Sequence, residues 1–159
     1  MNEVDKRETL RMVSNGLFIL TSRSGATYGA AVVAWLSQAS FRPPLLMVAI
    51  RKQCRVLECL LQSGAAAIHI LGSEQEEIAE KFFAPTKVSS QMINGEPFVN
   101  GQTCAPILQN LPAYLECRLD NVVETGGDHV VVILEVVAAK RCKEERPLMV
   151  ANSPWHYAG

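Results

Sequence analysis

The stretch AWLSQASFRPPLLMVAI, residues 34–50, places a rigid corner between a polar strand and a fully apolar one. Two serines and a glutamine lie in its first half. The tandem Pro43-Pro44 then fixes the backbone and removes two amide donors. Residues 45–50, LLMVAI, have the composition of a buried strand. Such a corner can simply begin a strand, or it can hold backbone N–H groups and hydroxyls toward a flat ligand.

The composition predicts one globular domain over residues 1–159, because 48% of the residues are hydrophobic. The net charge is −1 and no basic run follows a phosphate backbone, so nucleic acid is not an expected partner. The N-terminus lacks an apolar signal region, and no apolar stretch is long enough to cross a bilayer. We therefore expect a cytoplasmic protein with no membrane partner. Its five cysteines are expected to be reduced and buried, with no metal site.

Apolar patterning predicts about six strands and two or three short helices. A helical face is expected at Val56, Leu57, Leu60 and Leu61, closed by Gly64. The strands are expected at residues 17–22, 28–41, 45–50, 65–72, 112–123 and 130–139, and the helices at residues 5–15, 56–63 and 73–83.

The third helix has the clearest local signals. Ser73 and Glu76 fit a capping box, and Glu77 with Lys81 is a favourable i, i+4 pair. The residues after it, 86–106, are rich in Gly and Pro and are expected to form a long ordered loop.

The order of the strands decides the fold class. They come in runs joined by turns and do not alternate with helices, which favours a mainly β, antiparallel barrel with appended helices over a doubly wound sheet. The strand at 130–139 is apolar on both faces apart from Glu135, so its outer face is expected to pack on another layer or on a second subunit.

Common local catalytic motifs are absent from the sequence, including G-x-G-x-x-G, the Walker loop and G-x-S-x-G. Residues 51–55, RKQCR, carry three cations that can clamp a phosphate or remain solvated. Lys81 can reach a phosphate or pair with Glu77. His129 lies at a hairpin rim, where it can donate a proton or be an ordinary surface residue. The aromatic tail at residues 154–157, PWHY, can cover a flat cofactor or lock a dimer.

Four segments, taken in order, resemble the flavin reductase-like, FMN-binding split-barrel family over nearly the whole chain. They are residues 17–29, 36–50, 65–83 and 126–137. Residues 35–41 and 154–159 look closest to the C-terminal reductase module of cyanobacterial-type diflavin flavoproteins. The resemblance implies a split β-barrel (antiparallel, Greek-key-like) that forms a homodimer. It also implies FMN, or FAD, as cofactor and NADH or NADPH as donor.

The resemblance also implies where the cofactor lies. Many family members have Thr and Ser where this chain has Val32 to Trp35, so fewer hydroxyls are expected beside the flavin ring, and the choice between FMN and FAD stays open. His129 is the expected catalytic residue, orienting the nicotinamide or relaying a proton. The residues expected along the ring edge, largely through backbone atoms, are Val33, Ala34, Trp35, Leu36 and Ser37. The expected ribityl and phosphate contacts are Ser40, Arg51, Lys52, Gln53, Arg55 and Lys81. Phe83 is a further expected cofactor contact, and the aromatic gate is Trp155, His156 and Tyr157.

The function implied is that of an NAD(P)H-dependent flavin reductase, in which the nicotinamide gives a hydride to the flavin. Two alternatives stay open at this point. One is an FMN-binding electron-transfer module that serves a flavodoxin-like or di-iron partner module. The other is a flavin-free split-barrel dimer that acts as a binding unit.

Overall fold

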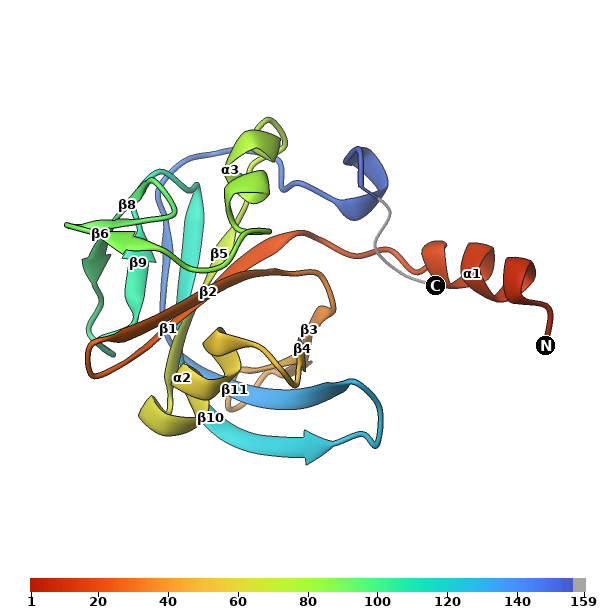
Figure 1. The fold of residues 1–159 in the computed structure, drawn as a ribbon, viewed down its shortest axis with the longest axis horizontal. Coiled ribbons are helices and arrows are strands. Elements are labelled where there is room, and N and C mark those ends of the chain that lie inside the picture. Colours follow the sequence, from red (N-terminus) through yellow and green to blue (C-terminus); the bar gives the residue numbers. More distant parts are fainter. Residues whose placement is uncertain (156–159) are drawn as a thin grey trace.

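The fold is built on one large antiparallel sheet and one small one (Figure 1). The computed structural model describes residues 1–155, and within them the large sheet has seven strands in the order β2-β1-β5-β10-β11-β4-β3. These strands are β1 (Phe18–Ser24), β2 (Thr27–Val33), β3 (Leu36–Ser40), β4 (Leu45–Arg51), β5 (Ala65–Ile70), β10 (Ala113–Glu124) and β11 (His129–Arg141). The prediction of a mainly β, antiparallel architecture with few helices is confirmed.

The predicted single extended segment at residues 28–41 is in fact two strands on opposite edges of the sheet. A tight turn separates them, in which the Leu36 amide donates to the Ala34 carbonyl oxygen (3.0 Å). The Trp35 carbonyl oxygen then accepts from the Ala49 amide on β4 (2.9 Å). This turn carries the chain from β2 to the β3–β4 hairpin, so that β2 and β4 can face each other across a gap.

Helix α2 (Arg55–Ser63) packs directly on the β1–β2 hairpin. Val56, Leu57 and Leu60 are buried against it, and Gly64 ends the helix in the left-handed conformation (φ 67°), as predicted. Leu61 was expected on the same face but is 48% exposed, since it points away from the sheet. The approach is close enough that a Cβ built at Gly29 would lie 2.4 Å from the Val56 Cα.

Helix α3 (Glu76–Lys81) does not begin with the predicted capping box. Gln75 is the N-cap residue; its side-chain oxygen accepts from the Gly72 amide and its side-chain nitrogen donates to the Asn110 carbonyl oxygen. Lys81 pairs with Glu96 (2.6 Å), a residue distant in sequence, instead of with Glu77. Both local predictions were wrong because the tertiary structure offers these side chains partners that the local sequence does not contain.

The segment expected to be an irregular loop forms the small sheet. Its strands are β6 (Val88–Ser89), β7 (Met92–Ile93), β8 (Glu96–Asn100) and β9 (Pro106–Leu108), paired antiparallel in chain order. The strands are short, and Gly and Pro residues lie at their ends, which obscured them in the sequence. With the seven strands of the large sheet, this gives eleven in the described residues instead of about six.

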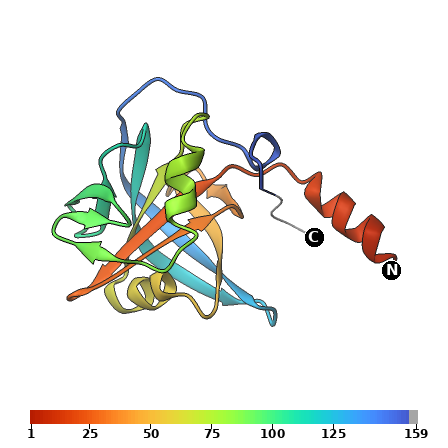
Figure 2. The same ribbon diagram turned by 45° about the horizontal axis from the view of Figure 1, so that its top comes forward.

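Helix α1 (Glu3–Arg11) projects from the body of the molecule (Figures 1 and 2). It begins at Asn2, whose side-chain oxygen accepts from the Val4 amide (2.9 Å), and none of its residues is buried. It was expected over residues 5–15. Within residues 1–155, no helix has both the length and the apolar character that crossing a membrane requires.

Candidate functional site

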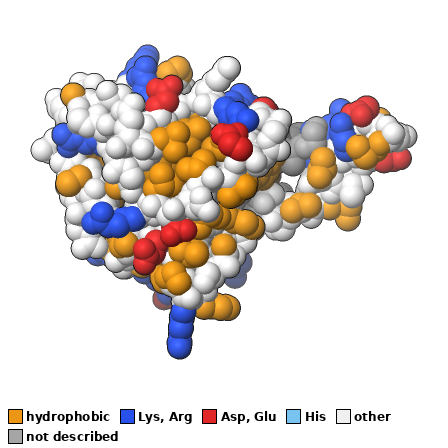
Figure 3. Space-filling view, turned by 90° about the horizontal axis from the view of Figure 1, so that it is seen from below, with side chains coloured by type: hydrophobic (Ala, Val, Ile, Leu, Met, Phe, Trp, Pro, Cys, Tyr) orange, Lys and Arg blue, Asp and Glu red, His pale blue; other side chains and the backbone are white. Residues whose placement is uncertain are grey.

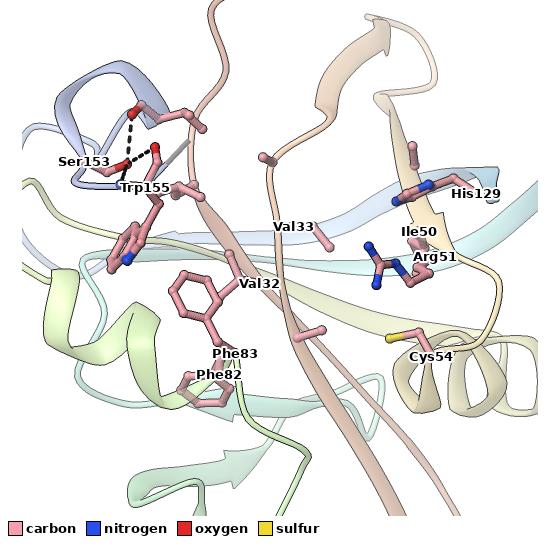
Figure 4. Close-up of a pocket in the computed structure, with 15 residues that line it drawn as sticks. Val32, Val33, Ile50, Arg51, Cys54, Phe82, Phe83, His129, Ser153 and Trp155 are labelled. Carbon is pink, nitrogen blue, oxygen red and sulfur yellow. Dashed lines mark hydrogen bonds between the residues drawn. The ribbon is translucent and has the colours of Figure 1, made fainter. Parts of the chain in front are cut away.

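A cleft of about 290 Å³ lies between β2 and the end of β4 (Figure 4). Phe82 and Phe83, which directly follow helix α3, and the C-terminal segment at residues 150–155 close one end of it. The residues that line it are Leu17, Ala31, Val32, Val33, Ala34, Ala49, Ile50, Arg51, Cys54, Phe82, Phe83, His129, Val150, Ser153 and Trp155. We call this space the main cleft. Because these residues come from almost every part of the chain, only the folded sheet assembles them.

One end of the main cleft is polar. Figure 4 shows the Arg51 guanidinium pointing into the space near Cys54, with His129 beside it. Arg51 and His129 are directly paired across β4 and β11, which is why two residues far apart in the sequence meet here. Arg51 is the one arginine or lysine among the described residues that line the cleft, and its backbone is held on a regular strand.

His129 is held in place from two sides. Its Nδ1 lies 2.8 Å from Oδ1 of Asp128, and its ring lies against Trp35, with centroids 4.8 Å apart. The hydrogen bond from His129 lowers the pKa of the exposed Asp128 carboxyl below its ordinary value. Since the carboxylate only accepts, Nδ1 carries the proton, and Nε2 is the atom left to meet a ligand.

The other end of the main cleft is aromatic. The Phe83 and Trp155 rings meet edge to face, with centroids 4.9 Å apart and planes at 88°. Ser153 fixes the turn that carries Trp155, because its hydroxyl donates to the Val150 carbonyl oxygen (2.8 Å). Phe82 is buried below this pair. A planar, mostly apolar group therefore finds an aromatic wall at this end and a cation at the other.

The sequence-predicted site residues separate into two groups. Those that line the main cleft are Val33, Ala34, Arg51, Phe83, His129 and Trp155. Those that do not are Trp35, Leu36, Ser37, Ser40, Lys52, Gln53, Arg55 and Lys81. His156 and Tyr157 lie outside the described residues.

Several residues of the second group have other surroundings. Trp35, Leu36 and Ser37 line a separate groove of about 820 Å³ between α1 and the sheet. Lys52 pairs with Glu124 across the β10–β11 hairpin (2.9 Å). Lys81 pairs with Glu96 and lines another cavity next to the β6–β7 hairpin. The tight turn at Ala34 explains why Trp35, Leu36 and Ser37 line this groove and not the main cleft, because the turn directs the side chains after it away from β2.

Sequence reasoning missed much of the apolar lining, including Leu17, Ala31 and Ile50. These side chains are ordinary strand residues, and nothing in the local sequence distinguishes them from core positions. Cys54 was also missed, although it lies within the RKQCR segment that drew attention for its cations. The prediction that all cysteines are buried is wrong for Cys104 and Cys142, which are exposed.

The residues present fit a flavin. The walls supply apolar surface from β2 and an aromatic end, and the polar end supplies a guanidinium and an imidazole. Small-molecule sites generally have this composition, with volumes from about 300 Å³ upward. The main cleft is therefore near the lower limit for a site built from one chain.

The model of the flavin reductase like domain matches residues 10–158. The chain belongs to the flavin reductase like domain family. It is 35% identical over 127 residues to a flavin reductase (NADH) of Kitasatospora aureofaciens, which covers 79% of this chain and 64% of that protein. It is also 32% identical over 143 residues to diflavin flavoprotein A 1 of Synechocystis, covering 89% of this chain.

Solved structures of other proteins share the fold. A Streptomyces globisporus NADH:FAD oxidoreductase superposes with a TM-score of 0.76 at 24% identity, covering 86% of this chain and 80% of that one. By contrast, this chain spans only about a quarter of the length of the Synechocystis diflavin flavoprotein. The family domain is thus found both in proteins of similar size and as one part of much longer ones.

Proposed function

We propose that the protein is an NAD(P)H-dependent flavin reductase that binds FMN in the main cleft. The observation that carries this proposal is the pairing of a cation and an aromatic end in one apolar cleft, in a chain of this family. Bound there, the flavin supplies the capacity to take two electrons from a reduced nicotinamide and pass them on.

The residues of the chain bind and orient the reactants. Arg51 is the proposed partner of the flavin phosphate, because a guanidinium forms strong charge-assisted hydrogen bonds with phosphate oxygens. Val33 and Ala34 offer an apolar wall to the ring. Phe83 and Trp155 exclude water from the far end. His129, oriented by Asp128, is the proposed group that positions the nicotinamide or relays a proton through Nε2.

A homodimer is the proposed assembly. Helix α1 buries none of its residues, and Leu10 and Val13 are 45% and 61% exposed. Hydrophobic side chains are visible on the projecting helix and on the neighbouring surface in Figure 3. The large groove between α1 and the sheet adds to this surface and shares Ala49 with the main cleft. A second copy packed there would extend a cleft that is small for a flavin.

An electron-transfer role is a second candidate, and the long diflavin relatives favour it. In that role the bound FMN would exchange electrons with a flavodoxin-like or di-iron module, and reduction by free nicotinamide would be slow. Anaerobic mixing with NADH or NADPH separates the two candidates. Rapid bleaching of the flavin absorption at about 450 nm supports the reductase. Bleaching only in the presence of a partner module supports the second role.

The assignment of the main cleft is tested with FMN and riboflavin, which differ by the phosphate. We expect Arg51→Ala to weaken FMN binding about tenfold and to leave riboflavin binding unchanged, because the lost contact is to the phosphate. Lys140→Ala, on an exposed part of β11, is the matched control. Equal binding of FMN by the variant and the parent protein would refute the assignment. A protein that binds neither compound would refute the proposed function itself.

A further inference from the structure

Trp35 lies at the boundary between the main cleft and the groove of about 820 Å³ beside α1. We call this space the α1 groove; its sheet side includes Trp35, Met47, Ala49 and Val131. Ala49 lines both spaces, whereas Trp35 lines the groove and not the cleft. Because the Trp35 carbonyl oxygen accepts from the Ala49 amide (2.9 Å), the backbone of Trp35 is fixed where the two spaces meet.

The pairing of β4 with β11 explains why Trp35 reaches His129. Ala49 pairs with Val131, and two residues further along the same strands Arg51 pairs with His129. Side chains two residues apart on a strand point to the same face of a sheet. Trp35, bonded to the backbone of Ala49, therefore lies next to the imidazole, with ring centroids 4.8 Å apart and planes at 51°.

The backbone of His129 is well fixed, but its side chain needs further support. The His129 carbonyl oxygen accepts from the Thr125 hydroxyl, and the residue is paired on β11. Its Nδ1 lies 2.8 Å from Oδ1 of Asp128, whose side chain is 83% exposed. A bond to an exposed carboxylate competes with water and holds a side chain only weakly. The indole ring covers the imidazole beside this bond, so it is the contact that restricts rotation of the ring.

We propose that Trp35 is a positioning residue for His129, which keeps the imidazole on Asp128 and Nε2 directed into the main cleft. This inference rests on the proposed function, in which Nε2 meets the nicotinamide or relays a proton. Among the described residues Trp35 does not line the main cleft. It therefore acts through His129 and is not itself a contact of the flavin.

The direct test follows the pKa of the Asp128 carboxyl by NMR in the purified full chain, before flavin is added. The hydrogen bond from His129 lowers this pKa, so the pKa reports whether the imidazole stays in place. We expect Trp35→Ala to raise it toward the ordinary value of an aspartate, and Trp35→Phe, which keeps a ring, to leave it low. An unchanged pKa in Trp35→Ala overturns the inference, even if the protein proves not to be a flavin reductase.

Met47→Ala is the matched control. Met47 is 43% exposed and lines the same groove, but it pairs with Ile133, four residues along β11 from His129. The substitution removes apolar bulk from the α1 groove, and it should leave the Asp128 pKa low. A rise as large as that in Trp35→Ala would mean that any change in the groove reaches Asp128, and the specific role of Trp35 would be lost.

A kinetic comparison separates positioning from a general structural role. We expect Trp35→Ala to lower kcat for flavin reduction about tenfold at saturating NADH or NADPH, with FMN affinity unchanged. In a His129→Ala background the same substitution should have no further effect, because no imidazole is left to position. Equal losses in both backgrounds would contradict the proposal. If Trp35→Ala does not fold, Trp35→Leu, which keeps apolar bulk without the ring, carries the same expectations.

Discussion

At the scale of the residue, His69 shows how a side chain that sequence reasoning leaves without a role can join two sheets. It is fully buried on β5. Nδ1 donates to the Ile19 carbonyl oxygen (3.0 Å), and Nε2 accepts from the Leu108 amide (3.0 Å). A carbonyl only accepts and an amide only donates, so these partners require the neutral tautomer with the proton on Nδ1. Burial lowers the pKa of His69 to about 4.

This burial predicts a loss of stability in mild acid. Below about pH 6.5 the unfolded chain takes up a proton at His69, whereas the folded protein does so only near pH 4. The free energy of unfolding should therefore fall by about 3 kcal/mol from this group between those values. Urea unfolding at pH 7.5 and pH 4.5 measures it. His69→Gln should be less stable at pH 7.5 but show a smaller decrease; a decrease equal to that of the parent protein would contradict the prediction.

A second residue-scale prediction concerns His129. His129→Ala removes the hydrogen bond that depresses the pKa of Asp128, so that pKa should rise toward the ordinary value, as followed by carboxyl NMR during a pH titration. The rate of flavin reduction should fall about 100-fold, while FMN affinity stays nearly constant, because the residue acts on the nicotinamide side. An unchanged reduction rate would remove His129 from the proposed mechanism.

At the scale of the element, strands proved easier to predict than the contacts between elements. The apolar run before Arg51, the Gly-containing hairpin at residues 124–128 and the helix closed by Gly64 each follow from local patterns and are present. The capping box at Ser73 and the pair Glu77–Lys81 follow equally good local rules and are absent. Each local gain is worth well under 2 kcal/mol, so a buried partner such as Glu96 outweighs it.

The contact between α2 and the β1–β2 hairpin gives an element-scale prediction. Gly29→Ala places a Cβ 2.4 Å from the Val56 Cα, which is backbone and cannot rotate away. The helix must shift, and we expect a loss of about 2–3 kcal/mol in the free energy of unfolding. Gly127→Ala is the control, because its new Cβ meets only the Thr125 hydroxyl at 3.5 Å. Chemical denaturation of the two variants checks the difference, and similar midpoints would contradict it.

At the scale of the whole molecule, α1 is the element that the monomer does not explain. A nine-residue helix is too short to be stable alone in water, and none of the residues of α1 is buried. Lys6 and Leu10, four residues apart on the helix, line the groove beside the sheet together with Val13, which follows the helix. A second copy packed on this helix and groove would bury the apolar side chains of α1 and so stabilise the helix.

The corresponding prediction concerns the oligomeric state. Leu10→Glu should convert a dimer to a monomer in light scattering after size exclusion, and the monomer should bind FMN more weakly because the groove adjoins the main cleft at Ala49. Val99→Glu, an equally exposed position on the small sheet, should remain dimeric. A monomeric parent protein, or a dimer unaffected by Leu10→Glu, would contradict the assignment of this interface.

The resemblance to the family led us to expect residues 33–34 and 51 at the cofactor site. The sequence by itself determined the class of fold and the main strands. It could do so because burial imposes a period of two on strands and because turns need Gly and Pro. Only the tertiary structure decided which side chains share a space. The turn at Ala34 places Trp35 outside the lining of the cleft, and Lys81 pairs with Glu96 instead of lining it. Phe82, just after α3, lines the cleft although it is distant in sequence from β2 and β4. Side-chain partners depend on distance in three dimensions, and that distance is set by strand pairings between residues far apart in the chain.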